Sequence, residues 1–206
     1  HYVAGRHFTK QAKKLAKAIS KFYCDMCTSL IVPTEKVEKI IKSYGVSKDM
    51  YVIPTGIDIE KFYRKNYTDE ERKELRKQYD IEDDEFLCIF IGRVAREKSI
   101  DFLIESFSKV EDKKIKLLIV GKGPELEDFK VFAKKFNFGN RVIFSGEVPY
   151  ERVPIYYQIG DLFLNASISE TQGLTFIEAM ASEIAISARF DDNLKEMFID
   201  RKAGLL

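Results

Sequence analysis

The chain has 206 residues, enough for one large domain or for one domain and part of a second. Hydrophobic residues make up 45% and charged residues 33%, with 11 glycines and 5 prolines, and these values exclude a disordered or fibrous protein. No apolar run approaches the roughly 18–20 residues that cross a bilayer, and we expect no secretory signal at the start. We expect a cytoplasmic globular protein whose sequence, lacking an initial Met, begins inside a longer chain.

The three cysteines, an odd number, favour reduced thiols and a cytosolic location. Cys24 and Cys27 have the C-x-x-C spacing that can bind zinc or act in redox chemistry. A zinc site needs four ligands, and no second pair of Cys or His lies nearby in the sequence. We therefore expect no metal site, and the sequence predicts neither a cofactor nor a nucleic-acid partner.

Positive charge is concentrated at the start of the chain. The residues up to Lys48 include ten Lys and Arg against three Asp and Glu, in a chain whose net charge is +1. Apolar residues recur there every three or four positions, which predicts a helix with one apolar stripe and a cationic opposite face: Phe8, Ala12, Leu15, Ile19 and Phe22. Such a helix can lie on an anionic membrane surface, here through residues 6–23, or pack on a neighbouring domain.

The first part of the chain predicts short elements. We expect strands at residues 28–34 and 51–54, with an amphipathic helix at residues 35–44 between them. The highly charged residues 61–85 include a helix-forming segment at residues 69–79. This charged stretch is typical of a connection between two structural units.

From residue 86 onward apolar strands alternate with helices. The expected strands are residues 86–92, 116–121, 141–145, 161–165 and 184–188, and the expected helices are residues 100–110, 125–136, 151–158, 174–182 and 193–200. This alternation predicts the α/β class, with right-handed βαβ units and a parallel sheet covered by helices on both faces. A ligand is expected in the crevice at the carboxyl ends of the strands.

The sharpest local signal is S-E-T-Q-G-L-T-F-I-E-A-M-A at residues 169–181, which leads from a strand end into a helix. Gly173 allows close approach of a ligand, and the free amides of residues 173–175 favour a phosphate at the helix start. Glu178 lies inside the helix, where a carboxylate can accept two hydrogen bonds from a ribose diol. The alternative interpretation makes Glu170 a helix-capping acid and Glu178 a solvated surface residue.

A basic loop, G-R-V-A-R-E-K at residues 92–98, follows the first strong strand. Arg93 offers a planar fork and Lys98 a compact charge, so the two can clamp a diphosphate and stabilise charge on a leaving group. The alternative is a solvated turn. The glycine turn G-K-G-P at residues 121–124 is too short for the G-x-G-x-x-G dinucleotide fingerprint, so we do not expect an oxidoreductase.

In combination these segments resemble the C-terminal half of the retaining glycosyltransferases of GT-B architecture, in the large family 4. The E-x7-E spacing from Glu170 to Glu178 is the most characteristic feature of that family. Other segments match its pattern in the same order: residues 54–58 with Phe62, 92–98, 120–124 and 142–146. The string S-E-T-Q-G-L-T is most similar to bacterial glucosyltransferases that act on diacylglycerol.

The resemblance implies a Rossmann-like donor domain at residues 51–206, preceded by residues 1–50 as the tail of an N-terminal acceptor domain. It implies that Arg93 and Lys98 hold the diphosphate of a UDP-sugar, with UDP-glucose the expected donor, and that Glu170 contacts the sugar. The other implied donor contacts are Gly92, Gly146, Val148, Gln172, Gly173, Leu174, Thr175 and Glu178, of which Glu178 would bind the ribose. The nucleophile would be a hydroxyl of a lipid or saccharide acceptor, and a lipid acceptor would place the enzyme at the inner face of the membrane.

Three departures from the family pattern accompany the matches. Ser99 stands where a glycine usually follows the loop lysine, and Glu183 and Ala185 stand where a glycine and a proline are common. Residues 189–193 replace a glycine-rich segment. None of these changes removes a charged residue of the implied donor site.

Most of an acceptor domain is missing from this sequence, so we expect donor binding without efficient transfer. Two rival functions fit a related scaffold. A sugar-nucleotide epimerase would need catalytic histidines across a cleft, and the two histidines of the chain are His1 and His7. A non-catalytic nucleotide-binding protein would tolerate loss of Glu170 or Lys98, and both are present.

Overall fold

The computed structural model describes residues 10–167 and 170–189, which divide into two compact units. The first contains the residues up to Ile57 together with Glu170–Gln172, and the second contains the rest from Asp58. The division at Ile57 lies beyond the boundary after residue 50 that the sequence predicted. It does so because strand β2 (Met50–Val52) pairs in parallel with β1 (Leu30–Val32) and is therefore part of the first unit.

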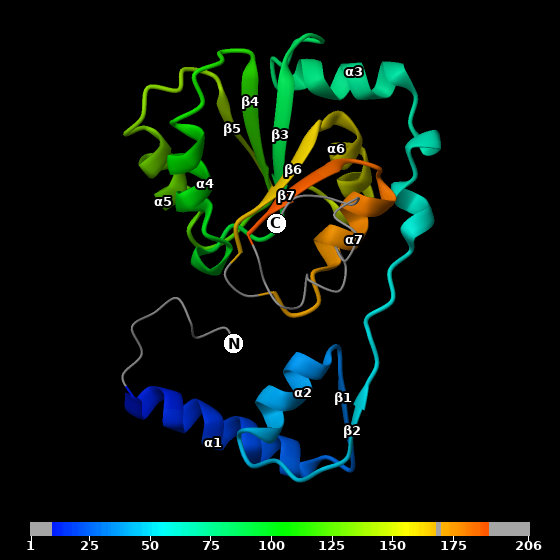
Figure 1. The fold of residues 1–206 in the computed structure, drawn as a ribbon, viewed down its shortest axis with the longest axis vertical. Coiled ribbons are helices and arrows are strands. Elements are labelled where there is room, and N and C mark those ends of the chain that lie inside the picture. The colour runs from blue at the N-terminus through cyan, green and yellow to red at the C-terminus, as the bar shows by residue number, and fades with distance from the viewer. Residues whose placement is uncertain (1–9, 168–169, 190–206) are drawn as a thin grey trace. The chain divides into compact units, whose positions relative to one another are not determined.

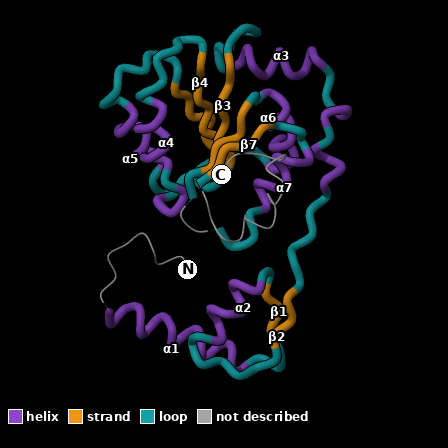
Figure 2. Tube along the Cα trace, in the orientation of Figure 1, coloured by secondary structure: helices purple, strands orange, loops and turns teal. Residues whose placement is uncertain are grey.

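The first unit contains α1 (Lys10–Met26), β1, α2 (Glu35–Lys42) and β2 (Figure 2). Helix α2 begins where it does because the side chain of Thr34 accepts a hydrogen bond from the backbone N–H of Val37 at 3.3 Å. The segment Glu170–Gln172 joins this unit through side-chain hydrogen bonds. The Lys36 ammonium donates to the carbonyl of Glu170 at 3.2 Å, and the Gln172 amide makes two hydrogen bonds of 3.0 Å with the backbone of Thr55.

The second unit is a five-stranded parallel sheet in the order β5-β4-β3-β6-β7 (Figure 1). Helices α4 and α5 cover one face of this sheet, and α6 and α7 cover the other, with α3 packed on α6 (Figure 1). The strands are β3 (Phe86–Ile91), β4 (Ile115–Val120), β5 (Val142–Gly146), β6 (Leu162–Asn165) and β7 (Ala185–Ala188). The helices are α3 (Asp69–Gln78), α4 (Ile100–Phe107), α5 (Leu126–Ala133), α6 (Val153–Ile159) and α7 (Leu174–Ala181).

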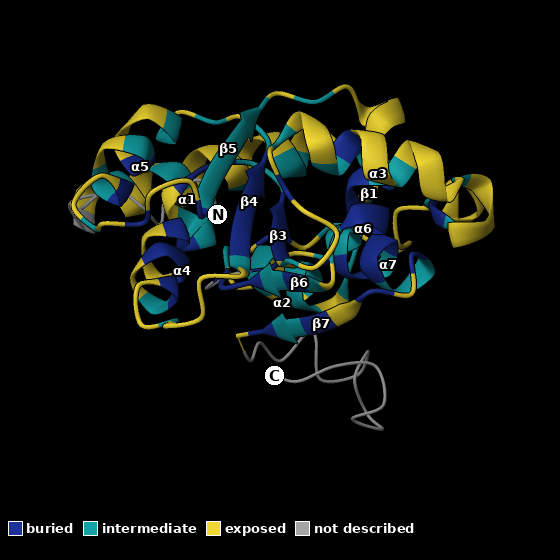
Figure 3. Ribbon diagram, turned by 90° about the horizontal axis from the view of Figure 1, so that it is seen from above, coloured by how far each residue is buried: buried dark blue, intermediate teal, exposed yellow. Residues whose placement is uncertain are grey.

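The central strands β3 and β4 are buried on both faces (Figure 3). On one side of the sheet Phe90 and Leu117 pack in a cluster with residues of α4 and α5. On the other side Phe163 of β6 stacks between Tyr157 and Phe176, with ring centroids 5.6 and 5.7 Å away. This double burial explains why β3 is a continuous apolar run and why β4 is apolar from Leu117 to Val120.

The predicted fold class is confirmed: the described strands and helices match the expected elements in type and order. Their ends differ by a few residues. Helix α6 begins at Val153, two residues later than predicted, because Tyr150–Arg152 form a 3₁₀ turn ahead of it. The helix expected at residues 193–200 lies outside the described residues.

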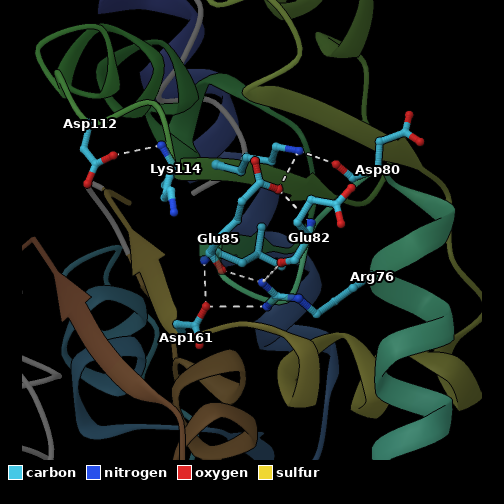
Figure 4. Close-up of polar contacts among 9 residues, drawn as sticks. Arg76, Asp80, Glu82, Glu85, Asp112, Lys114 and Asp161 are labelled. Atoms are coloured by element: carbon cyan, nitrogen blue, oxygen red, sulfur yellow. Dashed lines mark hydrogen bonds and ion pairs between the residues drawn. The ribbon is translucent and has the colours of Figure 1, made fainter.

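A polar network closes the amino-terminal end of the sheet (Figure 4). Arg76 of α3 donates to the carbonyls of Ile159, Glu82 and Glu85 at 2.8, 3.0 and 2.5 Å, and its guanidinium lies 3.5 Å from Asp161. Asp161 in turn accepts a 2.7 Å hydrogen bond from the backbone N–H of Leu87. Arg76 thereby attaches the connecting helix α3 to the starts of β3 and β6.

Replacing this guanidinium should destabilise the fold without touching the opposite end of the sheet. We expect Arg76→Met to lower the free energy of unfolding by roughly 2–4 kcal/mol, because three carbonyls lose a charged donor and the carboxylate of Asp161 loses its ion-pair partner. Urea unfolding measures this change. Lys73→Met is the matched control on the same helix, since its exposed ion pair with Asp83 should contribute less than about 1 kcal/mol. Equal effects of the two substitutions would contradict the assignment.

Candidate functional site

The direction in which successive strands are added to the sheet reverses beside β3, which makes this position a topological switch point. The chain runs from β3 outward to β4 and β5, and then returns to place β6 on the other side of β3. The residues that follow β3 and β6 are therefore neighbours at the carboxyl edge, which is where open α/β sheets generally bind their ligands. A hydrogen bond of 3.2 Å from the Ser167 hydroxyl to the carbonyl of Glu97 joins these two strand ends.

The basic loop after β3 is fixed by backbone hydrogen bonds to the end of β4 and to the turn that follows it. The backbone N–H of Gly92 donates to the backbone carbonyl of Val120 at 3.0 Å, and the N–H of Val94 donates to the backbone carbonyl of Lys122 at 2.9 Å. Val94 is fully buried, whereas Arg93 and Lys98 are half-buried. The Arg93 guanidinium lies 3.9 Å from the carboxylate of Glu97. Backbone hydrogen bonds thus fix the position of this loop, and two of its cations are partly exposed.

The glycine turn after β4 lies in close contact with the backbone of the basic loop. A Cβ atom on Gly121 would lie 2.0 Å from the carbonyl oxygen of Gly92, and one on Gly123 would lie 1.9 Å from that of Val94. Both distances are far below contact distance, so only glycine allows this approach. Gly121 also donates to the carbonyl of Gly146 at 3.0 Å. The turn therefore connects the basic loop to the end of β5, where the base was predicted to bind.

Helix α7 begins at Gly173, which adopts the left-handed conformation with φ of 72° and is buried. Leu174 and Thr175 follow as its first residues. The first N–H groups of a helix have no carbonyl partner within it, and the helix dipole adds partial positive charge there. This helix start can accept a phosphate. The residue at the N-cap position is this glycine, which has no side chain to cap the helix.

Glu178 is buried, with 6% of its surface exposed, so the alternative interpretation of this residue as a solvated side chain is wrong. Its carboxylate accepts a 2.8 Å hydrogen bond from the hydroxyl of Tyr157. Burial raises the pKa of Glu178 above its usual value, and the hydroxyls of Tyr157 and Tyr150 partly oppose that rise. A buried acceptor beside a phosphate-binding helix start can hold a hydroxyl-rich ligand.

The structure places most predicted donor residues on the carboxyl-edge loops of the second unit. These are Gly92, Arg93, Lys98, Gly146, Val148, Gly173, Leu174, Thr175 and Glu178. Glu170 and Gln172 lie instead in the first unit, where the Gln172 amide is paired with Thr55. Donor contact by all eleven residues remains a prediction.

Two of the three departures from the family pattern fall at left-handed backbone positions. Ser99 has φ of 49° and Glu183 has φ of 58°. Glycine adopts this conformation without steric cost, whereas a residue with a Cβ atom does so at some expense in stability. The basic loop and the turn after α7 therefore keep the backbone geometry that glycine would favour, despite the change of residue.

Sequence reasoning missed Tyr150 and Tyr157. Tyr157 lies in an apolar helix that the sequence pattern assigns to the core, and Tyr150 lies in a short connection. The available signal was a tyrosine in a helix that the pattern assigns to the core, because a buried hydroxyl needs a hydrogen-bond partner.

Within residues 10–167 and 170–189, no three His, Cys, Asp or Glu side chains gather as a metal site would require.

A family model described as glycosyl transferases group 1 matches residues 71–206. The chain belongs to this family. Its whole length is 37% identical to an alpha-monoglucosyldiacylglycerol synthase of Acholeplasma laidlawii, of which it covers 53%. It is 33% identical to an enzyme of the same name from Streptococcus pneumoniae, again over its whole length and covering 47% of that protein. The chain thus spans about half the length of these relatives.

Several solved structures share the fold. Anabaena HepE in complex with UDP and glucose has a TM-score of 0.79 at 18% identity, covering 93% of this chain and 51% of that one. Sucrose-phosphate synthase from Thermosynechococcus elongatus has a TM-score of 0.77 at 24% identity, covering 96% of this chain and 50% of that one. The predicted GT-B glycosyltransferase resemblance is confirmed by these matches.

The raised pKa of Glu178 predicts a pH-dependent stability. Between the usual pKa of a glutamate and the raised one, the folded protein keeps a proton that the unfolded chain has released, so stability falls as pH rises through that window. We expect Glu178→Gln to be at least as stable as the wild type at neutral pH, and this advantage to vanish below about pH 4. Urea unfolding across pH measures it. Glu105→Gln, an exposed position on α4, is the control, and a Glu178→Gln variant less stable at neutral pH would contradict the assignment.

Proposed function

We propose that this chain is the donor-binding half of a retaining hexosyltransferase that uses a UDP-sugar, with UDP-glucose the donor. Residues 1–50 are the tail of the acceptor domain in this proposal, so the chain binds donor without efficient transfer by itself. The observation that carries it is the carboxyl edge of the sheet, where the basic loop follows β3 and helix α7 begins, with the buried carboxylate of Glu178 inside that helix.

The proposed roles follow from the chemistry of each group. Arg93 and Lys98 bind the diphosphate and stabilise the charge that develops when it leaves. The backbone of Gly173–Thr175 binds a phosphate, and Glu178 accepts hydrogen bonds from the ribose. The turn from Gly146 to Val148 flanks the base. Glu170 contacts the sugar, and the acceptor hydroxyl is the nucleophile.

Similarity to two enzymes named alpha-monoglucosyldiacylglycerol synthase supports diacylglycerol as the acceptor. The geometry of α1 is in keeping with a lipid surface. Leu15, Ile19 and Phe22 are 62%, 48% and 62% exposed, and the neighbouring Lys13 and Lys14 are exposed as well. No helix in residues 10–167 and 170–189 is long and apolar enough to cross a membrane. We propose that residues 6–23 contact the inner face of the membrane peripherally; residues 6–9 lie outside the described part.

The donor site is tested by calorimetric titration with UDP-glucose, UDP and GDP-mannose, on this chain and on the full-length protein. We expect selective binding of the uridine nucleotides. Lys98→Ala should weaken UDP binding roughly 10- to 100-fold, because a charge-assisted contact is lost, and Glu178→Ala should weaken it comparably. Lys113→Ala is the control, since it removes the same charge at the amino-terminal end of β4.

Two outcomes would contradict the proposal. One is the absence of nucleotide binding by the full-length protein. The other is equal weakening by Lys98→Ala and Lys113→Ala, which would indicate unspecific attraction between the anion and the surface. Binding by the full-length protein alone would show that the site needs the missing half.

Membrane contact is tested by sedimenting the full-length protein with vesicles of phosphatidylglycerol or of phosphatidylcholine. We expect binding to the anionic vesicles that weakens with salt and that Phe22→Ser reduces several-fold, because an apolar anchor is lost. Phe102→Ser removes a phenylalanine on α4 that is 55% exposed and should leave binding unchanged. Equal binding to both vesicles, or equal effects of both variants, would overturn the contact.

A further inference from the structure

The loop after β6 contains a buried serine that contacts the basic loop. Ser167 is 3% exposed and lies two residues beyond the end of β6. Its hydroxyl donates to the backbone carbonyl of Glu97 at 3.2 Å, across 70 residues of sequence. Strands β3 and β6 are neighbours in the sheet, so this hydrogen bond joins the loops that follow their carboxyl ends (Figure 1).

Asn165 fixes the backbone of Ser167. Asn165 is the last residue of β6 and is buried. Its Oδ1 atom accepts a 2.8 Å hydrogen bond from the backbone N–H of Ser167. An asparagine that accepts a hydrogen bond from the backbone two residues further on turns the chain sharply. The position of Ser167 is therefore set from the end of β6.

The carbonyl that Ser167 contacts belongs to the peptide group between Glu97 and Lys98. The N–H of the same peptide group donates to the carbonyl of Ala95 at 3.0 Å. A peptide group is planar, so hydrogen bonds to both its C=O and its N–H fix its orientation. The Cα atom of Lys98 lies in that plane, and the base of the Lys98 side chain is fixed with it.

Arg93, the other cation considered for the diphosphate, is supported from the opposite side of β3. The next residue, Val94, donates to the carbonyl of Lys122 at 2.9 Å, and its own carbonyl lies against Gly123. These contacts come from the turn after β4, whereas Ser167 follows β6, and β3 lies between these two strands. Each cation thus has its own backbone support.

We propose that Ser167 is a positioning residue that holds Lys98 for the diphosphate of the donor, acting through the peptide group between Glu97 and Lys98. This inference rests on the proposed function and deepens it. A lysine is a point charge on a flexible four-carbon stem, so its contribution to binding depends on where the base of that stem is held. A fixed base reduces the conformational entropy that is lost when the ligand binds.

The test is a double-mutant cycle on UDP binding by the full-length protein, measured by calorimetry. We expect Ser167→Ala to weaken UDP binding roughly 3- to 10-fold, because the base of Lys98 is no longer held. In the Lys98→Ala background the same substitution should weaken binding less than about 2-fold, because the group through which it acts is gone. In the Arg93→Ala background the full effect should persist, since that cation is supported from the turn after β4.

Ser108→Ala is the matched control. Its hydroxyl also donates to a backbone carbonyl, that of Glu105 at 2.6 Å, but it lies at the opposite end of α4 from the basic loop. It should leave UDP binding within about 2-fold of the wild type. Ser167→Cys fills a similar space with a weaker donor and should show the pattern of Ser167→Ala at smaller amplitude.

The inference would be overturned if Ser167→Ala left UDP binding unchanged, or if Ser108→Ala weakened it as much. It would also be overturned if the effect of Ser167→Ala were as large in the Lys98→Ala background, which would indicate a general structural role. Loss of the effect in the Arg93→Ala background would show that the loop loosens as a whole. Wild-type protein that does not bind UDP would overturn the proposed function itself, whereas UDP binding that is insensitive to Ser167→Ala would leave that function standing.

Discussion

The burial of β3 on both faces is the constraint on which the rest of the second unit depends. Along its length β3 has helices above and below it and carries only apolar side chains and Cys88, so charged groups are confined to its two ends. At the amino-terminal end the polar chemistry is structural, since Arg76 and Asp161 anchor a connecting helix. At the carboxyl end it is available for a ligand, because β4 and β6 lead away from β3 in opposite directions.

The candidate site is held together by backbone contacts more than by side chains. Gly121 and Gly123 lie so close to the carbonyls of Gly92 and Val94 that no Cβ atom fits between them. The same turn is hydrogen-bonded to Gly146. Two loops far apart in sequence thus have a fixed spacing, which a rigid diphosphate-linked ligand requires of its site.

Glu178 illustrates how a binding site can work against stability. Its burial raises the carboxyl pKa, so the charged form that a ribose would recognise is the form that burial disfavours. The hydrogen bond from the Tyr157 hydroxyl compensates for part of this cost. A carboxylate retained at such a position is easier to explain by a ligand than by packing, because an apolar or amide side chain would fill the same space at lower cost.

The sequence by itself determined the fold class, the order of the elements and the loops that carry the charged residues. It could do so because doubly buried strands are continuous apolar runs, and because glycines and charges at their ends follow local rules. Tertiary structure alone decided that Glu178 is buried, that Gln172 pairs with Thr55, and that Tyr157 is a partner of Glu178. These contacts join residues from different elements, and local periodicity contains no information on which side chains meet across a sheet and its covering helices.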